Sequence, residues 1–564
     1  SDLDIVAALT DENVPIQPEG TTQTLQELDK VFIQLRHPRY GATLGDFVYE
    51  RGEQDGGEFG QLSRKLQGAN ATATLQDVLG QGNSLAIGIT GATSRGKYTS
   101  NQIQGVEGSQ GPYRLTGRDA SRRPVVIAGT ERVYIDGQLM TRGETNDYTI
   151  DYGTGEVSFS ARRLITYATR ITVDFEYSDR QFTRNLVGAS ARVSAFDNRL
   201  HLFTSVTQEA DDPASPIDIA LNDSLREIIA GSGTDKYKAS VSGLLFAGRD
   251  SISLTGRGQY TLKDTIINGG HRPLLVYSPG HPLAYYSATF SFVDEMPTDS
   301  IGYSRSNSGG YVVAGLGKGS YLPIQFLPIP ELHRVISGRA TFDPHSDVTI
   351  SGDYAFSSYD ENRLSSLDND ANHGGAYKIS MEYHPKEVRV GNLVLGTMDL
   401  SASDRFVDRR FVSLDRVSEI EFDRNWNVTK SSVGDEEIRQ AALTYKPLKS
   451  ISVAATYGSL ERKESVRSTR LTMNVSLSDS ALPDIGHKWE YIRTEDRRTL
   501  NKSTWTRQQS TISYEVRRLK PVLRVEMEDR QDRSPFTDSL LTGSFRYLEI
   551  APGLSLINLD PFRA

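Results

Sequence analysis

The feature that most constrains this chain is the alternation of apolar and polar side chains along run after run of residues. In LVGASARVSAFDNR, residues 186–199, Val187 and Val193 share one face, and the run ends at a tight turn around Asp197. Residues 200–206 then resume the alternation. A period of two is that of a β-strand with one apolar and one polar face. The sequence therefore predicts antiparallel β-hairpins.

The hairpin pattern recurs along most of the chain, and its two ends differ. One end carries tight turns, and the other carries long polar segments, among them residues 209–236, 357–375 and 493–509. Such asymmetry is typical of a transmembrane β-barrel, whose two ends face different compartments. We expect tight turns at His37-Pro38, Gly248 to Asp250, Asp343-Pro344, His384 to Lys386, Lys446-Pro447, near Ser480 and near Lys520-Pro521.

Composition helps to separate the fold classes that alternate in this way. A soluble β-sandwich or β-solenoid also alternates, but this chain is only 37% hydrophobic and its mean hydropathy is −0.43. A barrel explains the low value because half of each strand faces a wet lumen. The sequence has no stretch of 18 consecutive apolar residues, so a transmembrane helix is not predicted. We predict an all-β fold, a transmembrane antiparallel β-barrel of about 18–20 or more strands.

One segment breaks the rhythm of long strands. Its runs are short and its turns frequent, as at Asp136-Gly137 and Gly153 to Gly155. Asp-Gly between short alternating runs is a hairpin signal. We predict a small β-sandwich at residues 107–178, inserted between two barrel strands, that plugs or gates the lumen, hangs into the periplasm or decorates one rim.

The chain then has four parts: an N-terminal extension at 1–28, first barrel strands at 29–106, the inserted module at 107–178 and the remaining strands at 179–564. No signal peptide begins at Ser1, which we expect to be a processed end or an artificial boundary. The last residues show no clear closing strand with an aromatic end. Either another strand closes the barrel, or the chain is part of a longer polypeptide.

Charge and motifs point away from nucleic acid and from catalysis. The net charge of −9 is spread along the chain without a basic block, and the absence of cysteine excludes disulfides and thiolate ligands. There is no P-loop, GxSxG or HExxH motif, and GLGKGS at residues 315–320 lacks the P-loop spacing. We predict no catalytic residue and no enzyme activity. A barrel-type enzyme acting on lipid or glycan is an alternative without a motif behind it.

The segment DNDANHG, residues 368–374, resembles part of a calcium loop. Asp368, Asp370 and Asn372 provide its alternating oxygen ligands. The glycine at the sixth position and the distal glutamate of an EF-hand are missing. We expect a solvated external loop with at most weak calcium binding, and no other cofactor.

A dense mixed-charge stretch at residues 405–424, just before Trp426, indicates where a gate would lie. In a barrel it forms a lumen-facing ion-pair network, a docking edge or a solvated loop face. The inserted module adds two adjacent arginines. The candidate gating or lumen residues are Arg162, Arg163, Arg409, Arg410, Arg416 and Arg424.

The best helical candidate is LNDSLREIIAG, residues 221–231. Asn222 or Asp223 is expected to cap it, and Gly231 to end it. Because it lies in a long loop, we expect it to pack on the barrel rim, with covering the lumen or binding a partner as alternatives.

Several segments resemble those of large, uncharacterised outer-membrane proteins of Bacteroidota, Chlorobi and related bacteria. They are GVEGSQGPYRL (105–115), GTERVYIDGQLMTRGETNDYTIDYGTGEVSF (129–159), RITVDFEYSDRQFTR (170–184), EFGQLSRKLQGA (58–69), GLGKGSYLPIQFLPIP (315–330) and EIEFDRNWN (419–427). The resemblance implies an outer-membrane barrel. Some members are distantly similar to the translocon barrel of the type IX secretion system, and the inserted plug is similar in placement to that of pilus ushers. It supplies no catalytic residues.

The expected function is a channel or a secretion component in the outer membrane of a Gram-negative bacterium, with the inserted module or the long loops as gate. The alternative is a structural or adhesive surface protein within a larger complex. Outer-membrane lipid and envelope proteins are the expected partners, and nucleic acid is not.

Overall fold

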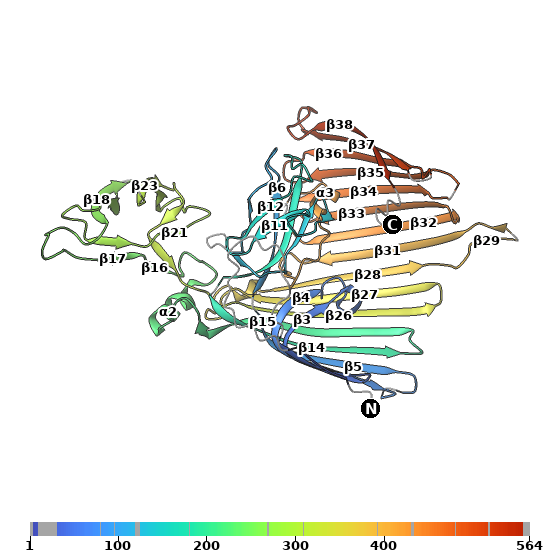
Figure 1. The fold of residues 1–564 in the computed structure, drawn as a ribbon, viewed down its shortest axis with the longest axis horizontal. Coiled ribbons are helices and arrows are strands. Elements are labelled where there is room, and N and C mark those ends of the chain that lie inside the picture. The colour runs from blue at the N-terminus through green and yellow to red at the C-terminus, as the bar shows by residue number, and fades with distance from the viewer. Residues whose placement is uncertain are drawn as a thin grey trace, which may run out of the picture.

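The computed structural model describes residues 4–8, 31–78, 80–94, 96–118, 124–179, 181–267, 270–307, 309–391, 393–429, 434–479, 481–516 and 519–556. An 18-stranded antiparallel sheet forms the body of the protein, so the all-β class and the expected strand number are confirmed (Figure 1). Its strands, in pairing order, are β1 (Asp4–Ala8), β2 (Phe32–His37), β3 (Tyr40–Arg51), β4 (Leu62–Gln76), β5 (Ser84–Ser94), β14 (Phe182–Ala195), β15 (Leu200–Pro216), β26 (Leu332–His345), β27 (Val348–Asp360), β28 (His373–Tyr383), β31 (Thr397–Val407), β32 (Glu436–Leu448), β33 (Ile451–Arg462), β34 (Val466–Leu477), β35 (Asp484–Asp496), β36 (Lys502–Ser513), β37 (Leu519–Arg533) and β38 (Phe545–Leu556).

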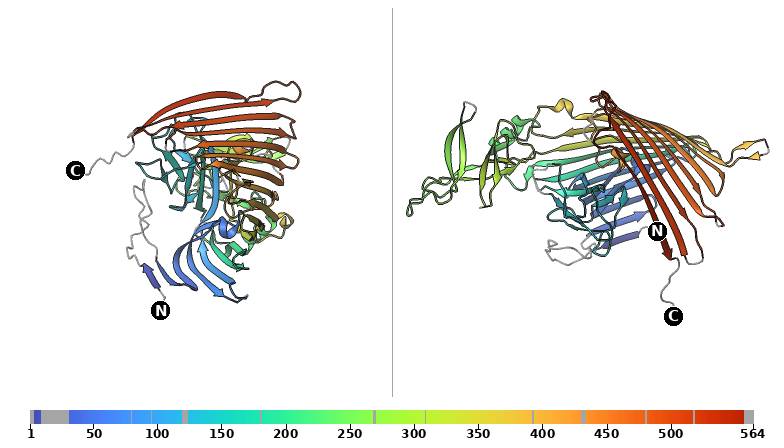
Figure 2. Two further views of the ribbon diagram at one scale, coloured as in Figure 1. Left: turned by 90° about the vertical axis from the view of Figure 1, so that its right-hand side faces the viewer. Right: turned by 90° about the horizontal axis from the view of Figure 1, so that it is seen from above.

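The sheet is strongly curved. Figure 2 shows β1 and β38 at its two edges on the same side of the molecule, with the other strands wrapping round between them. In the part of the chain that the structure describes, β1 pairs with β2 and β38 with β37, and no register joins β1 to β38.

The outer face of the sheet is apolar. Leu443, Met473 and Leu548 are 37%, 40% and 62% exposed, although all three lie inside strands. They belong to one row of directly paired side chains that crosses nine neighbouring strands: Tyr383, Leu400, Leu443, Ala455, Met473, Trp489, Gln508, Met527 and Leu548. Exposed apolar rows of this kind, not covered by a second sheet, are the lipid-facing belt of a membrane-spanning sheet.

The inner face is polar. One row of paired side chains crosses ten strands with no carboxylate, lysine or arginine: Gln76, Ser84, Ser194, His201, Thr341, Ser351, Ser380, Ser403, Gln440 and Gly458. Ser351 and Ser380 share a hydrogen bond of 2.6 Å, and Ser194 contacts the His201 ring at 3.1 Å. We call this set the hydroxyl row. Apolar-out and polar-in is the pattern that the sequence predicts.

The two ends of the sheet differ largely as expected. Tight turns at residues 38–39, 346–347 and 449–450 lie at one end, which we call the turn end, a few residues from their expected positions. The opposite loop end carries most of the inserted structure. The tight turn expected at His384 to Lys386 is wrong, because a small hairpin of β29 (Arg389–Val390) and β30 (Leu393–Val394) lies between β28 and β31 at the turn end. The long loop expected at residues 493–509 is wrong, because β35 and β36 continue through most of it and leave only 497–501 between them. The many charged residues of 493–509 resemble a loop in sequence, but every second side chain of these strands faces the polar interior.

The inserted module consists of two small sheets on the concave side of the large sheet (Figure 2). The module starts at β6 (Lys97–Gln104), ten residues before the start expected at residue 107. One sheet combines β6, β8 (Val125–Val126), β9 (Arg132–Ile135), β10 (Gln138–Leu139) and β13 (Arg170–Ser178), and the other β7 (Tyr113–Arg114), β11 (Tyr148–Asp151) and β12 (Glu156–Phe159). Val133, Val157 and Val173 are fully buried between them.

A second domain projects from the loop end between β15 and β26 (Figure 1). The barrel hairpin expected around Gly248 to Asp250 is wrong, because its residues belong to this projection. Period-two alternation marks any half-buried strand and does not say which sheet the strand joins. Its strands are β16 (Ser240–Ser242), β17 (Leu244–Phe246), β18 (Tyr260–Ile267), β19 (Gly270–Tyr277), β20 (Tyr286–Ala288), β21 (Ser291–Phe292), β22 (Ile301–Arg305), β23 (Tyr311–Leu316), β24 (Tyr321–Leu322) and β25 (Ile324–Phe326).

The expected helix is present as α2 (Asp223–Ser232), capped by Asn222, whose side chain accepts a hydrogen bond from the Leu225 backbone N–H at 2.9 Å. It ends at Ser232 with Gly233 as its C-cap, so the end expected at Gly231 is two residues early. In the described part of the chain, no helix has the length and apolar character needed to cross a bilayer.

Candidate lumen and docked module

The inserted module is held against the concave face of the sheet by a loop that turns inward. This loop, residues 408–429 between β31 and β32, is called the inner loop here and carries the short helix α3 (Phe422–Asn425). Phe422 and Trp426 pack with Ile438 and Leu460 of the sheet, and Leu414 packs with sheet residues farther along. The inner loop is therefore part of the wall.

Ion pairs connect the inner loop to the module. Arg416 makes a 2.7 Å ion pair with Asp174 of β13, and its guanidinium lies over the Tyr134 ring at 5.6 Å. Arg170 of the same strand pairs with Glu421 at 2.7 Å. The module's buried apolar cluster, in contrast, is made of its own residues. Charge pairs rather than a shared core thus hold the module.

Arg64 of β4 is the centre of the contact on the wall side. It is 1% exposed and bonds to Glu209 of β15 at 2.7 Å and to Asp415 of the inner loop. Its remaining donors reach the carbonyl oxygens of Ser63 and Leu414. One guanidinium therefore joins two strands of the wall and the inner loop.

A second cluster lies nearer the loop end. Lys97 at the start of β6 pairs with Asp179 at 2.8 Å, Glu331 at 3.2 Å and Asp211 at 3.6 Å. Burial lowers the pKa of the Lys97 amine, but these carboxylates raise it more, so the net shift is upward. Arg184 of β14 also contacts Asp211, at 3.0 Å. The point where the chain leaves the wall for the module is thus fixed by buried charges.

Glu176 of β13 is a buried carboxyl that lies close to the contact around Arg64, Glu209 and Asp415. Burial raises its pKa to about 7; Arg64 acts in the opposite direction, while Glu209 and Asp415 add to the rise. One of its oxygens, Oε2, has no hydrogen-bond partner. The docked module therefore favours the protonated form of Glu176.

The docked state is expected to weaken as pH rises. Below pH 4.5, the ordinary pKa of the group, Glu176 is neutral whether docked or released; above about 7 it is charged in both states, and the docked state bears the full burial cost. Between those two pH values, the docked state loses at most about 3 kcal/mol of stability relative to the released state. Chemical denaturation at pH 5 and pH 8 measures it. Glu176→Gln should remove this difference, and an unchanged difference in the variant would assign it to other groups.

Arg424 anchors the other end of the inner loop. It pairs with Glu528 of β37 and lies over the Trp505 ring at 5.2 Å. Arg507 and Arg530 of the sheet lie over the same ring at 5.0 and 5.2 Å. The Trp505 Nε1–H donates to Glu528 at 3.1 Å, so the indole is fixed in this position.

The remaining arginines predicted from the sequence lie elsewhere. Arg409 and Arg410 have exposed side chains where the inner loop begins. Arg162 is exposed on the segment between β12 and β13, and its neighbour Arg163 donates to Gln138 of the module at 3.1 Å. The structure therefore brings Arg416 and Arg424 into one loop at the module contact and leaves the other four outside that contact.

The predicted calcium residues lie between β27 and β28. Asp368 accepts a hydrogen bond from the Thr234 backbone N–H at 3.4 Å, just beyond the end of α2, and Asn372 donates to Asn369 at 3.0 Å. Within the described ranges, no three His, Asp or Glu side chains gather as a metal site would require. Calcium at these residues remains a prediction.

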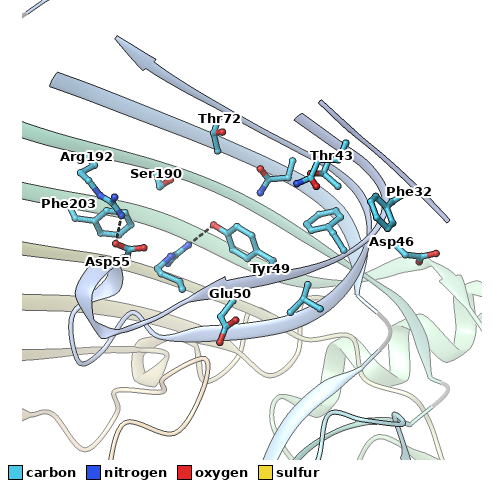
Figure 3. Close-up of a pocket in the computed structure, with 15 residues that line it drawn as sticks. Phe32, Thr43, Asp46, Tyr49, Glu50, Asp55, Thr72, Ser190, Arg192 and Phe203 are labelled. Atoms are coloured by element: carbon cyan, nitrogen blue, oxygen red, sulfur yellow. Dashed lines mark hydrogen bonds and ion pairs between the residues drawn. The ribbon is translucent and has the colours of Figure 1, made fainter. Parts of the chain in front are cut away.

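A hollow of about 560 Å³ lies on the wall beside the module contact (Figure 3). It is lined by strands from β2 to β15. Figure 3 shows Tyr49, Phe203 and Ser190 around it, with Arg192 pairing with Asp55 at its rim.

Several key residues were not predicted as site residues, notably Arg64, Lys97, Asp174, Glu176 and Glu209. All lie in alternating runs, where a charged residue on the polar face looks like any other. Their partners are far away in the sequence, so no local pattern identifies them.

Comparisons with known proteins give one sequence family. The family described as Domain of unknown function (DUF8818) matches residues 98–179, which is the inserted module. No curated protein matches the chain.

Among solved structures, similarity is found to outer-membrane proteins. The ferric-catecholate import receptor Fiu from E. coli K12 has a TM-score of 0.28 at 8% identity, covering 93% of this chain and 71% of Fiu. The anion-selective porin from Comamonas acidovorans has a TM-score of 0.21 at 8% identity, with 82% and 98% covered. The P pilus usher PapC translocation pore has a TM-score of 0.24 at 10% identity, with 94% and 87% covered. At these values none of the three identifies the function of this chain, and no catalytic family is matched.

Proposed function

We propose that this chain is a channel or translocation component of a Gram-negative outer membrane, and that the inserted module is its gate. The observation that carries the proposal is that the inner loop is attached to the wall in one way and the module to the inner loop in another. The inner loop shares apolar clusters with the wall, whereas the module is joined to the inner loop by ion pairs such as Arg416–Asp174 and Arg170–Glu421. Ion pairs re-solvate on separation, but an apolar core resists it.

The lumen supports the same proposal. The hydroxyl row lines ten strands of the wall without a charged side chain, nearer the turn end than the module contact. A polar, weakly charged wall suits passage of hydrophilic solutes or chains through a gated lumen. Lipid at the outer face and protein partners in the envelope belong to this proposal.

A reversible tether tests the gate. The chain has no cysteine, so Asp174→Cys with Arg416→Cys gives two unique thiols at the module contact. A reducible bis-methanethiosulfonate crosslinker between them should abolish voltage-induced openings in planar bilayers, and reductant should restore them. The double variant without crosslinker is the control. Openings that persist in the crosslinked protein would contradict a moving module.

The second candidate is an adhesive or structural surface role, favoured by the projecting domain with its exposed Phe246 and Ile252. A stoichiometric partner that depends on residues 236–327 would favour it.

A further inference from the structure

We propose that the hollow in Figure 3 binds a neutral oligosaccharide along the lumen wall. The inference deepens the proposed function, because the ligand reaches the hollow through the lumen. It names the chemical class of solute that the wall recognises.

Aromatic rings form one part of the hollow. Phe32, Phe47, Tyr49 and Phe203 all line it and all remain partly exposed. The Arg51 and Arg192 guanidiniums each lie 5.8 Å from the centre of the Phe203 ring and limit its movement. Partly exposed aromatic rings on a polar wall suit the C–H faces of sugar rings, which are the apolar surfaces of an otherwise hydrophilic ligand.

Planar amides and hydroxyls form the rest. Asn70 donates to Thr90 at 2.9 Å, which fixes its amide plane. The Gln34 carbonyl oxygen accepts from Arg36 at 2.6 and 2.9 Å, so its NH₂ group is presented as a donor. Thr72 and Ser190 add hydroxyls. Such groups pair with neighbouring hydroxyls of a sugar without requiring charge on it.

The two arginines that line the hollow are already engaged, which argues against an anionic ligand. Arg51 donates to Tyr49 at 2.9 Å, Ser205 at 2.8 Å and Thr207 at 3.0 Å. Arg192 pairs with Asp55. An anion would have to displace these partners.

An extended peptide is disfavoured by the backbone. The strands β3, β4, β5 and β14 around the hollow each pair on both sides. Among the described residues, none of these four strands offers an open edge that a peptide could join as an added strand. The hydroxyl row, which passes Ser194 and His201 just beyond Arg192 and Phe203, continues the polar surface around the wall for a longer chain.

Calorimetric titration of the detergent-solubilised full chain tests the proposal, with malto-, cello- and chito-oligosaccharides as neutral probes. We expect saturable binding of at least one probe. Tyr49→Ala and Phe203→Ala should each weaken it about three- to tenfold. Tyr49→Phe keeps the ring and should keep the affinity. Tyr354→Ala, on the outer face, is the matched control and should leave it unchanged.

Two outcomes overturn the proposal: no saturable binding of any of the three probes, or an equal loss in Tyr354→Ala. Preferential binding of an oligogalacturonate or of a neutral peptide also overturns it. Because binding is measured without conductance, failure of the gate leaves this test intact, and loss of binding leaves the gate test intact.

Discussion

Removing the inserted module should open the lumen and raise single-channel conductance on the order of tenfold, since closed barrels of roughly 16–18 strands leave an aqueous channel when nothing fills them. The deletion should span residues 97–178, replaced by a short flexible linker. A cut at residue 107 would leave β6 without β13, its antiparallel partner along Lys97–Gln104. Planar-bilayer recording measures the result.

Deletion of the projecting domain at residues 236–327 provides the control. It removes a comparable length of chain from the same end of the sheet, but Figure 1 shows it pointing away from the concave face. Its loss should leave conductance unchanged. Equal conductance in the wild type and in the protein lacking residues 97–178 would end the gating proposal.

Arg64→Met is expected to cause the largest loss from a single substitution. Methionine keeps much of the volume but leaves the carboxylates of Glu209 and Asp415 without their shared guanidinium. Breaking a buried ion pair on one side costs about 3–5 kcal/mol. We expect this loss in the free energy of unfolding, with faster proteolysis of the inner loop at residues 408–429.

Two further variants separate charge from packing in this prediction. Adding Glu209→Gln and Asp415→Asn to Arg64→Met removes the orphaned charges and should recover part of the loss. Arg439→Met breaks a pair whose arginine is 68% exposed, and should cost far less than Arg64→Met because solvent screens the pair. A similar loss in Arg64→Met and Arg439→Met would show that the buried network is unimportant.

Local patterns in the sequence were enough for most of the large sheet, although residues 493–509 of β35 and β36 were expected to be a loop. Alternation identifies most strands because one face meets lipid and the other a polar interior, and pairs such as Leu400 and Leu443 follow from it. The same pattern failed at residues 237–260, where short strands of the projecting domain alternate equally well. Which sheet a strand joins depends on pairing across long stretches of chain.

The candidate gate was predictable only in part. The mixed charge at residues 405–424 was visible, and it did contain Arg416 and Arg424. Their partners, Asp174 and Glu528, lie far before and far after them in the chain. Coulombic attraction acts through space, so spacing along one sequence cannot reveal which opposite charges meet.

The self-contained core of the inserted module has a consequence for how such proteins diversify. Because Val133, Val157 and Val173 are buried only among module residues, the domain can be exchanged between barrels as an interchangeable part, while the wall needs to retain only a few complementary charges. Substitutions should then accumulate quickly over most of the contact between the module and the inner loop. At its charged positions they should be coupled, because a reversed charge on one side requires a reversed charge on the other.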